Sequence, residues 1–307
     1  MIRLRALAAL LLALTLLAGC SDETDAPAAT RTVEHALGAT AVPAEPERIV
    51  ALNEYAILDA LVALEAPPIA ATGRQGKGFP FGAWLEGRTE GVELICCSTE
   101  PNLEQIATHE PDLILANPWQ EDIYAELSKI APTVGVPLTY VDYEQEVRDI
   151  AEIIGRPEAA DEAIARHRER LERFSAAVGK GPGLISVARV FPDSIRVEGE
   201  SYVPTLLANA GLERPAAHGK DLELSVERLP AIDGDVLFVY SADNPQEAER
   251  NARARERLAR HPLWRSLKAV RAGRAYTVDS ALWAGGGILW ADAMLDDLER
   301  HLLPDGT

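Results

Sequence analysis

The sequence has few of the residues from which most catalytic and metal sites are built. Its 307 residues include three cysteines and six histidines, and no two histidines have the close spacing of a metal-binding pair. There is no G-x-S-x-G nucleophile motif and no P-loop. These absences argue against a zinc or manganese site and against hydrolytic or nucleotide-driven chemistry. We therefore expect a protein that is not an enzyme.

Positive charge is also scarce. Lys and Arg number 30 against 48 Asp and Glu, which gives a formal net charge of −18. Loss of Arg3 and Arg5 with the leader described below would leave −20. A surface this acidic repels the phosphate backbone of a nucleic acid. Nucleic acid is therefore excluded as a partner. An anionic ligand would bind only where Arg or Lys is locally concentrated.

Apart from Cys20, the only cysteines are Cys96 and Cys97, which are adjacent at the end of an apolar segment. Two thiols cannot complete a zinc site, and neighbouring cysteines bridge only through a strained ring. We expect buried free thiols at the end of a strand. A vicinal redox pair is the alternative, because an exported protein meets an oxidising compartment.

The N-terminus has the organisation of an export signal. Residues 6–17 are apolar except for Thr15, follow a short basic stretch, and are too few for a stable membrane anchor. The next residues, A-G-C, resemble a bacterial lipobox, in which Cys20 becomes lipidated; an ordinary signal peptide or a buried helix is the alternative. We expect a signal peptide at 1–20, a flexible tether at 21–31 and a lipid-anchored protein. It would lie in the periplasm of a Gram-negative cell or on the outer face of a Gram-positive cytoplasmic membrane.

Two segments of the chain match each other. Residues 102–115 and 225–238 align without a gap, and each opens on a residue suited to N-capping, Asn102 or Ser225. A short amphipathic helix, a breaker, an Asp and a run of branched apolar residues follow in both copies. One helix-to-strand unit used twice predicts two α/β lobes of similar size.

The alternation of apolar runs with helical patterns predicts the layout of both lobes. In the N-terminal lobe, 32–154, we expect a parallel sheet of strands at 48–52, 69–72, 92–97, 113–116 and 138–141, with helices at 55–64 and 122–130. In the C-terminal lobe, 181–307, we expect strands at 184–189, 194–197, 236–240 and 275–278, with helices at 203–210, 246–260 and 288–302.

A linker at 155–180 separates the lobes. Pro157 suits a first helical position, and an apolar stripe at spacings of three and four runs to Val178, before a glycine-rich stop. Such a helix is about 30 Å long. His167 lies in the stripe and is expected to be packed rather than to bind a ligand. The predicted class is α/β, with two Rossmann-like lobes joined by one long rigid helix.

Several motifs in this order resemble one family. They are the lipobox, the strand–helix start R-I-V-A-L-N-E-Y-A-I-L-D-A-L, the block T-E-P-N-L-E-Q-I-A-T-H-E-P-D-L-I-L, the lone linker helix and the segment H-P-L-W-R-S-L-K-A-V-R-A-G-R-A-Y. Together they resemble the substrate-binding lipoproteins of ABC importers for ferric siderophores. The resemblance implies a monomer without a cofactor, which captures a ferric siderophore between its lobes and delivers it to a permease and ATPase complex. Haem or cobalamin is the alternative ligand because the fold also serves their uptake, and a chelatase-like enzyme is a further alternative.

The resemblance places the ligand in loops at the carboxyl ends of the strands. Arginine pairs there with anionic oxygens, and aromatic faces pack on the chelator. Ser98 stands where ferric-hydroxamate binders commonly carry Arg, which disfavours a hydroxamate or shifts that role to Arg74. A cluster of Arg74, Lys77 and Arg189 would favour a net-negative complex, but the chelator class stays open. The predicted ligand-binding residues are Arg74, Trp84, Ser98, Trp119, Arg189, Tyr202 and Trp283.

The resemblance also implies an acidic residue on each lobe that docks on the permease. Asp59 matches the first position, whereas the second holds Asn209, with Glu213 as a neighbouring substitute. If the ligand were haem, Tyr202 and His218 would be the candidate axial ligands. Trp264 and Trp290 lie in patterned helical segments and are expected in the core.

Overall fold

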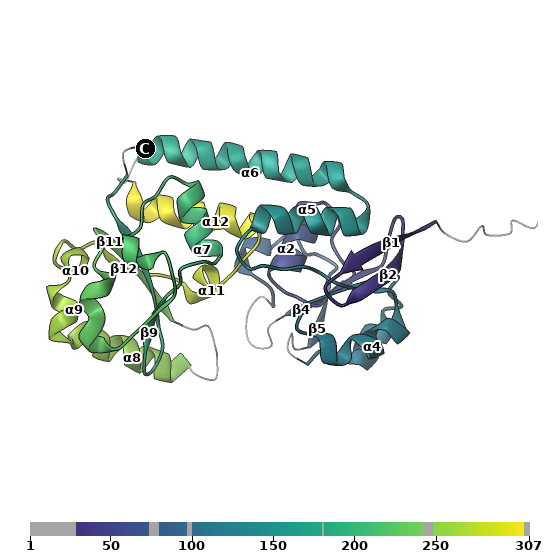
Figure 1. Ribbon diagram of the computed structural model, residues 1–307, viewed down its shortest axis with the longest axis horizontal. Helices are drawn as coiled ribbons and strands as arrows, with labels where there is room; N and C mark the ends of the chain where they lie inside the picture. The colour runs from purple at the N-terminus through teal and green to yellow at the C-terminus, as the bar shows by residue number, and fades with distance from the viewer. Residues whose placement is uncertain (1–28, 74–79, 97–99, 180, 242–247, 304–307) are drawn as a thin grey trace, which may run out of the picture.

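The computed structural model describes residues 29–73, 80–96, 100–179, 181–241 and 248–303. Two lobes lie side by side beneath one long helix, α6 (Pro157–Val178) (Figure 1). The predicted class, α/β with two lobes and a single linking helix, is confirmed. In the described ranges, no helix is long and apolar enough to cross a membrane.

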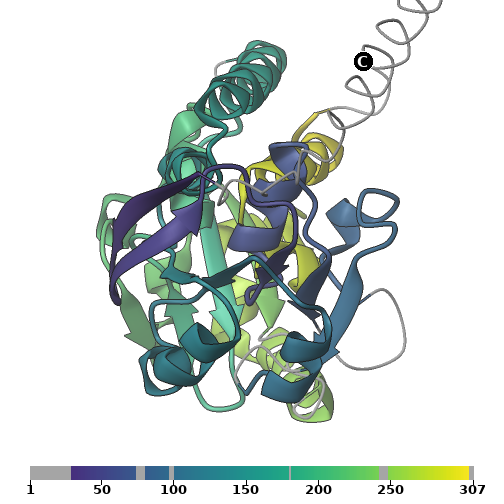
Figure 2. The same cartoon turned by 90° about the vertical axis from the view of Figure 1, so that its right-hand side faces the viewer.

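The N-terminal lobe contains a five-stranded sheet in the order β5-β4-β3-β6-β7, with every neighbouring pair parallel. A β1–β2 hairpin joins its outer side, at the front of Figure 2. The strands are β1 (Thr30–His35), β2 (Gly38–Pro43), β3 (Ile49–Ala51), β4 (Ala70–Gly73), β5 (Glu93–Cys96), β6 (Leu113–Ala116) and β7 (Thr133–Gly135). The helices are α2 (Ala56–Ala63), η1 (Ala83–Leu85), α3 (Leu103–Thr108), α4 (Glu121–Ile130) and α5 (Tyr143–Ile154).

The C-terminal lobe holds a mixed sheet in the order β10-β9-β8-β11-β12. Its strands β8, β11 and β12 are parallel, whereas β9 and β10 are antiparallel additions at one edge. The strands are β8 (Ile185–Val190), β9 (Ile195–Val197), β10 (Leu222–Leu224), β11 (Val236–Ser241) and β12 (Ala275–Thr277). The helices are α7 (Tyr202–Asn209), η2 (Ala216–His218), η3 (Val226–Ile232), α8 (Ala248–Arg260), α9 (Pro262–Ser266), α10 (Lys268–Arg271), α11 (Ser280–Trp283) and α12 (Ile288–Leu302).

Successive side chains of a strand point to opposite faces of the sheet, and in both lobes the side chains on the two faces are apolar. In β6, Leu113 and Leu115 face one cluster of buried residues, and Ile114 and Ala116 face another. In the C-terminal lobe, Phe238 faces the same cluster as Leu113. This shared cluster also takes in residues of α2, α5, α6, α7 and α12. The two lobes therefore have one continuous core beneath the linker helix.

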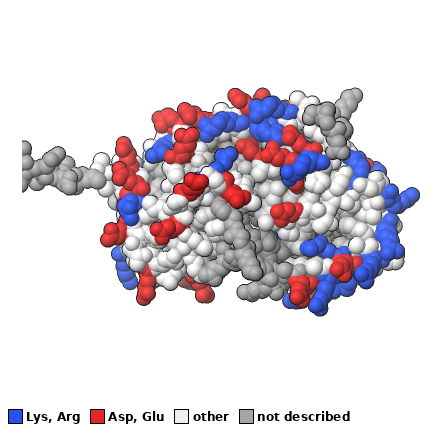
Figure 3. Space-filling model, turned by 180° about the vertical axis from the view of Figure 1, so that it is seen from behind, with Lys and Arg blue, Asp and Glu red and all other residues white. Residues whose placement is uncertain are grey.

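Helix α6 begins at Pro157 and ends before Gly179, as its sequence predicts. Its buried stripe packs on α5 and on α12. His167 is buried in this stripe: its Nδ1 is 2.7 Å from Asp292 Oδ1, and its Nε2 is 3.1 Å from the Tyr143 hydroxyl. The prediction that His167 is packed is confirmed. Charged side chains of both signs occupy the outer side of α6, along the top edge of Figure 3.

The repeated segment occupies equivalent places in the two lobes. Strands β6 and β11 begin within its two copies, and each pairs with the middle strand of its sheet, β3 or β8. Asp112 accepts the Arg48 N–H at 2.9 Å, just before β3, and Asp235 accepts the Leu184 N–H at 2.8 Å, just before β8. The helices differ: α3 is α-helical and capped by Asn102, but η3 is a 3-10 helix. Pro230 within η3 has no N–H for an α-helical ladder.

Other expectations were wrong. The fifth strand of the N-terminal sheet is β7, not 138–141, because Tyr140 has a φ of 58° and its N–H bonds to the Glu146 carboxylate. Residues predicted at the end of a tether belong to β1, where Arg31 donates to the Ile153 carbonyl. Cys96 is disulfide-bonded rather than a free thiol, and its partner lies outside the described residues. Trp290 is fully buried as expected, while Trp264 is partly buried against the core.

Candidate ligand-binding cleft

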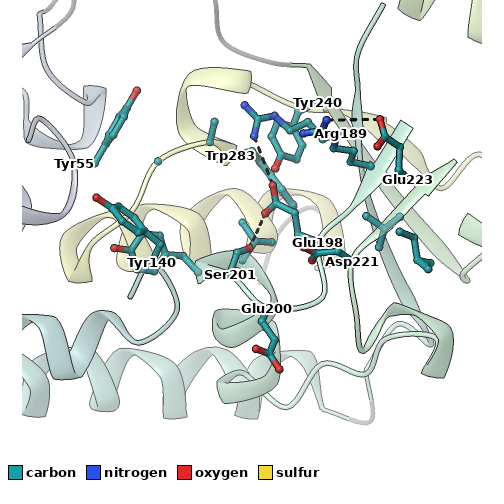
Figure 4. A pocket seen from close by; sticks show the side chains of 17 residues that line it. Tyr55, Tyr140, Arg189, Glu198, Glu200, Ser201, Asp221, Glu223, Tyr240 and Trp283 are labelled. Atoms are coloured by element: carbon teal, nitrogen blue, oxygen red, sulfur yellow. Dashed lines mark hydrogen bonds and ion pairs between the residues drawn. The ribbon is translucent and has the colours of Figure 1, made fainter. Parts of the chain in front are cut away.

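A cavity of about 600 Å³ lies where the two lobes meet. Tyr55 and Tyr140 of the N-terminal lobe stand on one side, and Arg189, Glu198 and Tyr240 of the C-terminal lobe on the other (Figure 4). Among the described residues, the lining consists of Tyr55, Tyr140, Arg189, Arg196, Val197, Glu198, Glu200, Ser201, Tyr202, Val203, Asp221, Leu222, Glu223, Tyr240, Trp283, Ala284 and Gly285. A volume of this size suits a small-molecule ligand.

The antiparallel edge of the C-terminal sheet brings charged side chains to the cavity. Arg189 near the end of β8 lies directly opposite Arg196 of β9, and Arg196 lies opposite Glu223 of β10. Side chains directly opposite in neighbouring strands point to the same face. Arg189 Nη1 is 3.6 Å from Glu198 Oε1, and Arg196 Nη2 is 3.6 Å from Glu223 Oε1. Both arginines of the described lining therefore have a carboxylate beside them.

Arg189 is also held by aromatic rings. Its guanidinium carbon is 5.2 Å from the centre of the Phe191 ring and 5.8 Å from that of Tyr240. Both separations are within the range of cation–π attraction. The arginine keeps 29 % of its side chain exposed. It is thus a positioned group that still reaches the cavity.

Tyr202 joins the two lobes at the cavity wall. It is the first residue of α7, and its hydroxyl donates to the Glu146 carboxylate of α5 at 2.5 Å. Glu146 is buried and also accepts the N–H groups of Thr139 and Tyr140, both at 2.7 Å. Burial raises the pKa of Glu146, although these hydrogen bonds act in the opposite direction. Burial, with the nearby Glu146 charge, also raises the pKa of Tyr202, so the hydroxyl is a donor at neutral pH.

Tyr140 occupies a backbone conformation that few side chains tolerate. Its φ of 58° lies in the left-handed region, and the Glu146 carboxylate fixes its N–H. The Tyr140 hydroxyl donates to Asn117 Oδ1 at 3.1 Å, and Trp119 stacks on the Tyr140 ring at 5.3 Å. Backbone strain supported by three partners indicates that the position of this ring matters to the cavity.

Three consecutive glycines carry the chain from α11 to α12 past side chains of both lobes. A Cβ on Gly285 would lie 2.6 Å from Trp290 and from Trp84, and one on Gly286 would lie 2.2 Å from the Tyr202 ring. One on Gly287 would lie 2.2 Å from the Asp59 carboxyl carbon, and Gly287 also has a φ of 116°. No larger residue fits without displacing these neighbours.

The structure brings three of the predicted ligand-binding residues to the cavity. Arg189, Tyr202 and Trp283 line it, although Tyr202 also ties the lobes and Trp283 is nearly all buried, donating to Asp297 at 2.7 Å. Arg74, Ser98 and Cys20 were predicted from the sequence but lie outside the described residues. Their roles stay predictions.

The other two predicted contacts do not line the cavity. Trp84 stacks on Tyr55, which does line it, and donates its indole N–H to Asp59 at 2.8 Å. Trp119 is 57 % exposed and stands behind Tyr140. Both tryptophans therefore support a lining tyrosine, and Trp119 has a large free surface at the edge of the cleft.

Asp59 was predicted to dock on a permease, but the structure buries it completely. Its carboxylate accepts the N–H groups of Leu289 and Trp290 at the start of α12, both at 2.9 Å. It therefore joins the lobes internally and has no surface for a partner. At the second position Asn209 is exposed and donates to the Tyr143 hydroxyl at 3.1 Å, while Glu213 is exposed nearby.

The haem ligand pair considered from the sequence does not form. His218 is fully buried in η2, its Nε2 lies 2.9 Å from the Ala231 carbonyl, and it does not line the cavity. Burial lowers the pKa of His218, which keeps the ring neutral. No group of three or more potential metal ligands occurs in the part of the chain that the structure describes.

Sequence reasoning missed Tyr55, Tyr140, Glu198 and Tyr240 as lining residues. Tyr240 ends the strand predicted at 236–240, which becomes β11, so its place at a strand end was a usable signal. Tyr140 was assigned to a strand that does not form. Glu198 follows β9, and although a hairpin at Pro192 and Asp193 predicts the antiparallel pairing of β9 with β8, nothing local indicated that this carboxylate would lie beside Arg189.

Comparisons with known proteins agree with this architecture. The model of the family described as periplasmic binding protein matches residues 96–282. A probable siderophore-binding lipoprotein of Bacillus subtilis is 34 % identical over 294 residues, covering 89 % of this chain and 88 % of the relative. The achromobactin-binding periplasmic protein of Dickeya dadantii is 30 % identical over 274 residues, covering 83 % and 86 %. The crystal structure of Staphylococcus aureus SirA complexed with staphyloferrin B shares the fold, with a TM-score of 0.79 at 24 % identity, covering 89 % of this chain and 98 % of that one.

Proposed function

This chain belongs to the periplasmic binding protein family, and on that premise we propose that it is the substrate-binding component of an ABC importer for ferric siderophores. The observation that carries the proposal is the cavity between the lobes, which combines aromatic rings with two fixed arginines. Aromatic rings pack on the carbon frame of a chelator, and guanidinium groups donate to the oxygens around the iron. Relatives named as siderophore-binding and achromobactin-binding support this ligand class.

We further propose delivery of the ligand to a permease and ATPase complex in the membrane. Export through the signal peptide and lipidation of Cys20 would hold the protein at the membrane, in agreement with the relative named as a lipoprotein. Because Asp59 is buried, docking must use other side chains of the outer surface. A Cys20→Ser variant should move from the membrane fraction to the soluble exported fraction. Retention of that variant in the membrane would contradict lipidation.

Capture without covalent chemistry is the mechanism we propose. No histidine lines the cavity among the described residues, and the Ser201 hydroxyl there donates to the Glu198 carboxylate at 2.7 Å. The ligand would leave as it entered, and the protein would supply shape, aromatic contact and oriented N–H donors. No cofactor is needed for this task.

Tryptophan fluorescence tests the proposal directly, because Trp283 lines the cavity and Trp119 stacks on the lining Tyr140. Ferric siderophores of hydroxamate, catecholate and citrate type are titrated one at a time, with the iron-free chelators as controls. We expect quenching with a micromolar or lower Kd for at least one class. No response to any ferric chelate, with a Soret shift on adding haem, would overturn the proposal and favour a haem-binding component.

A further inference from the structure

The charges that face the cavity are unusual for a site that would take an anion. Two arginines, Arg189 and Arg196, line it together with four carboxylates, those of Glu198, Glu200, Asp221 and Glu223. The formal charge of the described lining is therefore −2.

Glu198 lies beside Arg189 in the wall of the cavity. Its Oε1 is 3.6 Å from Arg189 Nη1, and its other oxygen accepts the Ser201 hydroxyl at 2.7 Å. The backbone carbonyl of Glu198 accepts a hydrogen bond from the Arg214 guanidinium, which also holds Glu198 in place. The carboxylate is thus held against the guanidinium by its own neighbours.

The second arginine also has a carboxylate beside it, in a pair whose two side chains are both more than half exposed. Arg196 lies opposite Glu223 in the β9–β10 pair, with 3.6 Å between Nη2 and Oε1. This leaves Asp221 and Glu200 without a compensating cation among the lining residues. Asp221 accepts the Gly199 N–H at 2.8 Å, and Glu200 points away from Arg189 at the rim (Figure 4).

We propose that the cavity selects ferric chelates of zero or positive net charge, and that Glu198 sets this selectivity by pairing with Arg189. The inference rests on the proposed function and specifies the ligand class of the same site. A neutral hydroxamate or carbonyl oxygen can still accept an N–H from either arginine. An anionic chelate must approach unpaired carboxylates or separate Arg189 from Glu198, and a walled cleft focuses that repulsion. An ammonium group on the chelate gains attraction from the same carboxylates.

A set of ferric chelates that differ in net charge tests the charge preference. Ferrioxamine B carries one ammonium group on a neutral iron–hydroxamate core, and its N-acetyl derivative keeps the same core but has a neutral amide in place of the ammonium. Ferric dicitrate and a ferric tris-catecholate supply anionic chelates. We expect the cation to bind about threefold or more tighter than the acetylated form, the anions to bind weakest, and the cation's advantage to shrink at high salt.

Glu198→Gln tests the residue, because the amide keeps the shape and can still accept from Ser201. The variant should bind every anionic chelate about threefold tighter and every cationic chelate about threefold weaker, with neutral chelates unchanged. Glu169→Gln on the exposed side of α6 removes the same charge far from the cavity and should change neither. Because the natural protein and each variant are compared with the same chelate, the shape of the chelate is constant and only the charge of the protein differs.

The outcomes are distinct. Tighter binding of anionic than of cationic and neutral chelates by the natural protein would overturn the charge preference and leave the proposed function standing. An unchanged preference in Glu198→Gln, with a natural melting temperature, would overturn the role of Glu198. No binding of any ferric chelate would overturn the proposed function and this inference with it.

Discussion

Asp59 accepts the backbone N–H of Trp290, which lies 231 residues further along the chain, at a distance of 2.9 Å. The carboxylate belongs to α2 of the N-terminal lobe, and the N–H belongs to the first turn of α12, after the strands of the C-terminal lobe. An anion at a helix N-terminus stabilises the unpaired N–H groups there. Here that stabilisation acts between the lobes. Gly287 packs directly against the Asp59 carboxyl group, and the Trp84 indole N–H donates to it.

Other buried bonds join the lobes in the same region. Tyr202 donates to Glu146, and the Tyr143 hydroxyl links His167 of the linker helix to Asn209 of α7. The shared core lies beneath them. A wide opening of the cleft would break all of these contacts, so we expect the lobes to move little when a ligand binds.

Replacing Asp59 by Asn should destabilise the protein by about 3 kcal/mol. The three N–H donors around Asp59 leave no acceptor for the amide NH₂ that Asn would place there. Urea unfolding of the variant and of the natural protein measures the difference. A loss below about 0.5 kcal/mol would show that the inter-lobe contact contributes little.

The penalty of Asp59→Asn should also depend on pH. Burial raises the pKa of Asp59 to about 7 in the folded protein, against about 3.9 in the unfolded chain. The folded state therefore holds the extra proton between pH 4 and 7, and the stability from Asp59 falls as the pH rises through this window. The difference in unfolding free energy between the natural protein and Asp59→Asn should be larger at pH 5 than at pH 8. A difference that grows with pH would contradict the raised pKa.

Tyr202→Phe should cost about 1–3 kcal/mol of stability, because it removes one donor from the buried Glu146 carboxylate. A double-mutant cycle with Glu146→Gln isolates the pair, and we expect a coupling of about 1 kcal/mol or more. Tyr143→Phe is a useful comparison, since it removes a hydroxyl bonded to His167 and Asn209 instead. Additive effects of Tyr202→Phe and Glu146→Gln would rule out a direct contribution from their bond.

Gly286→Ala should lower both stability and ligand affinity. Its Cβ would lie 2.2 Å from the Tyr202 ring, so the ring that lines the cavity must move, at a cost of about 2 kcal/mol. Gly219→Ala is the matched control, because its Cβ would meet only a carbonyl oxygen at 3.6 Å and should change stability by less than about 0.5 kcal/mol. Thermal melts and chelate titrations of both variants make the comparison. Equal behaviour of the two would contradict the close contact.

Trp119→Ala should weaken binding of the ferric chelate about two- to tenfold, with a change in stability below about 1 kcal/mol. Trp119 is 57 % exposed and its ring stacks on that of Tyr140. Removing the Trp119 side chain therefore leaves the core intact, but the Tyr140 ring that lines the cavity loses its stacking partner. Trp119→Phe keeps an aromatic face and should retain most of the affinity. Natural affinity in the alanine variant, measured by calorimetry, would exclude Trp119 from the site.

Elements with strong local signals were predicted well. Helix α6 runs from Pro157 to Val178 and α12 from Ile288 to Leu302, as expected, because a proline or glycine stands at the start of each and an apolar stripe runs through it. Weak local signals failed. The last strand of the N-terminal sheet was predicted at 138–141, whereas the structure has the short β7. An α-helix was predicted where η3 lies, although Pro230 interrupts an α-helical hydrogen-bond ladder.

Site residues were predictable where they stood at the boundary of a recognisable element, as Tyr202 does at the start of a helix and Trp283 does shortly before three glycines. Arg189 is such a case, and it lines the cavity. Its partner Glu198 was not foreseen, because nothing local indicates which carboxylate a neighbouring strand will present. Asp59 was assigned to the surface because the sequence around it does not show that α12 packs against α2. Helix α12 lies near the other end of the chain, and its Leu289 N–H bonds to Asp59.

The sequence by itself determined the lobes, their repeated unit, the linker helix and the family, since each depends on residues close together in the chain. Hydrophobic period, capping residues and helix breakers act over a few positions, so their effects can be read in one dimension. Only the tertiary structure decided that Asp59 is buried, that Tyr202 ties the lobes and that Arg189 and Arg196 each have a carboxylate beside them. Those facts depend on burial and on distances between distant segments, which set the pKa of a carboxyl group and the charge that a ligand meets.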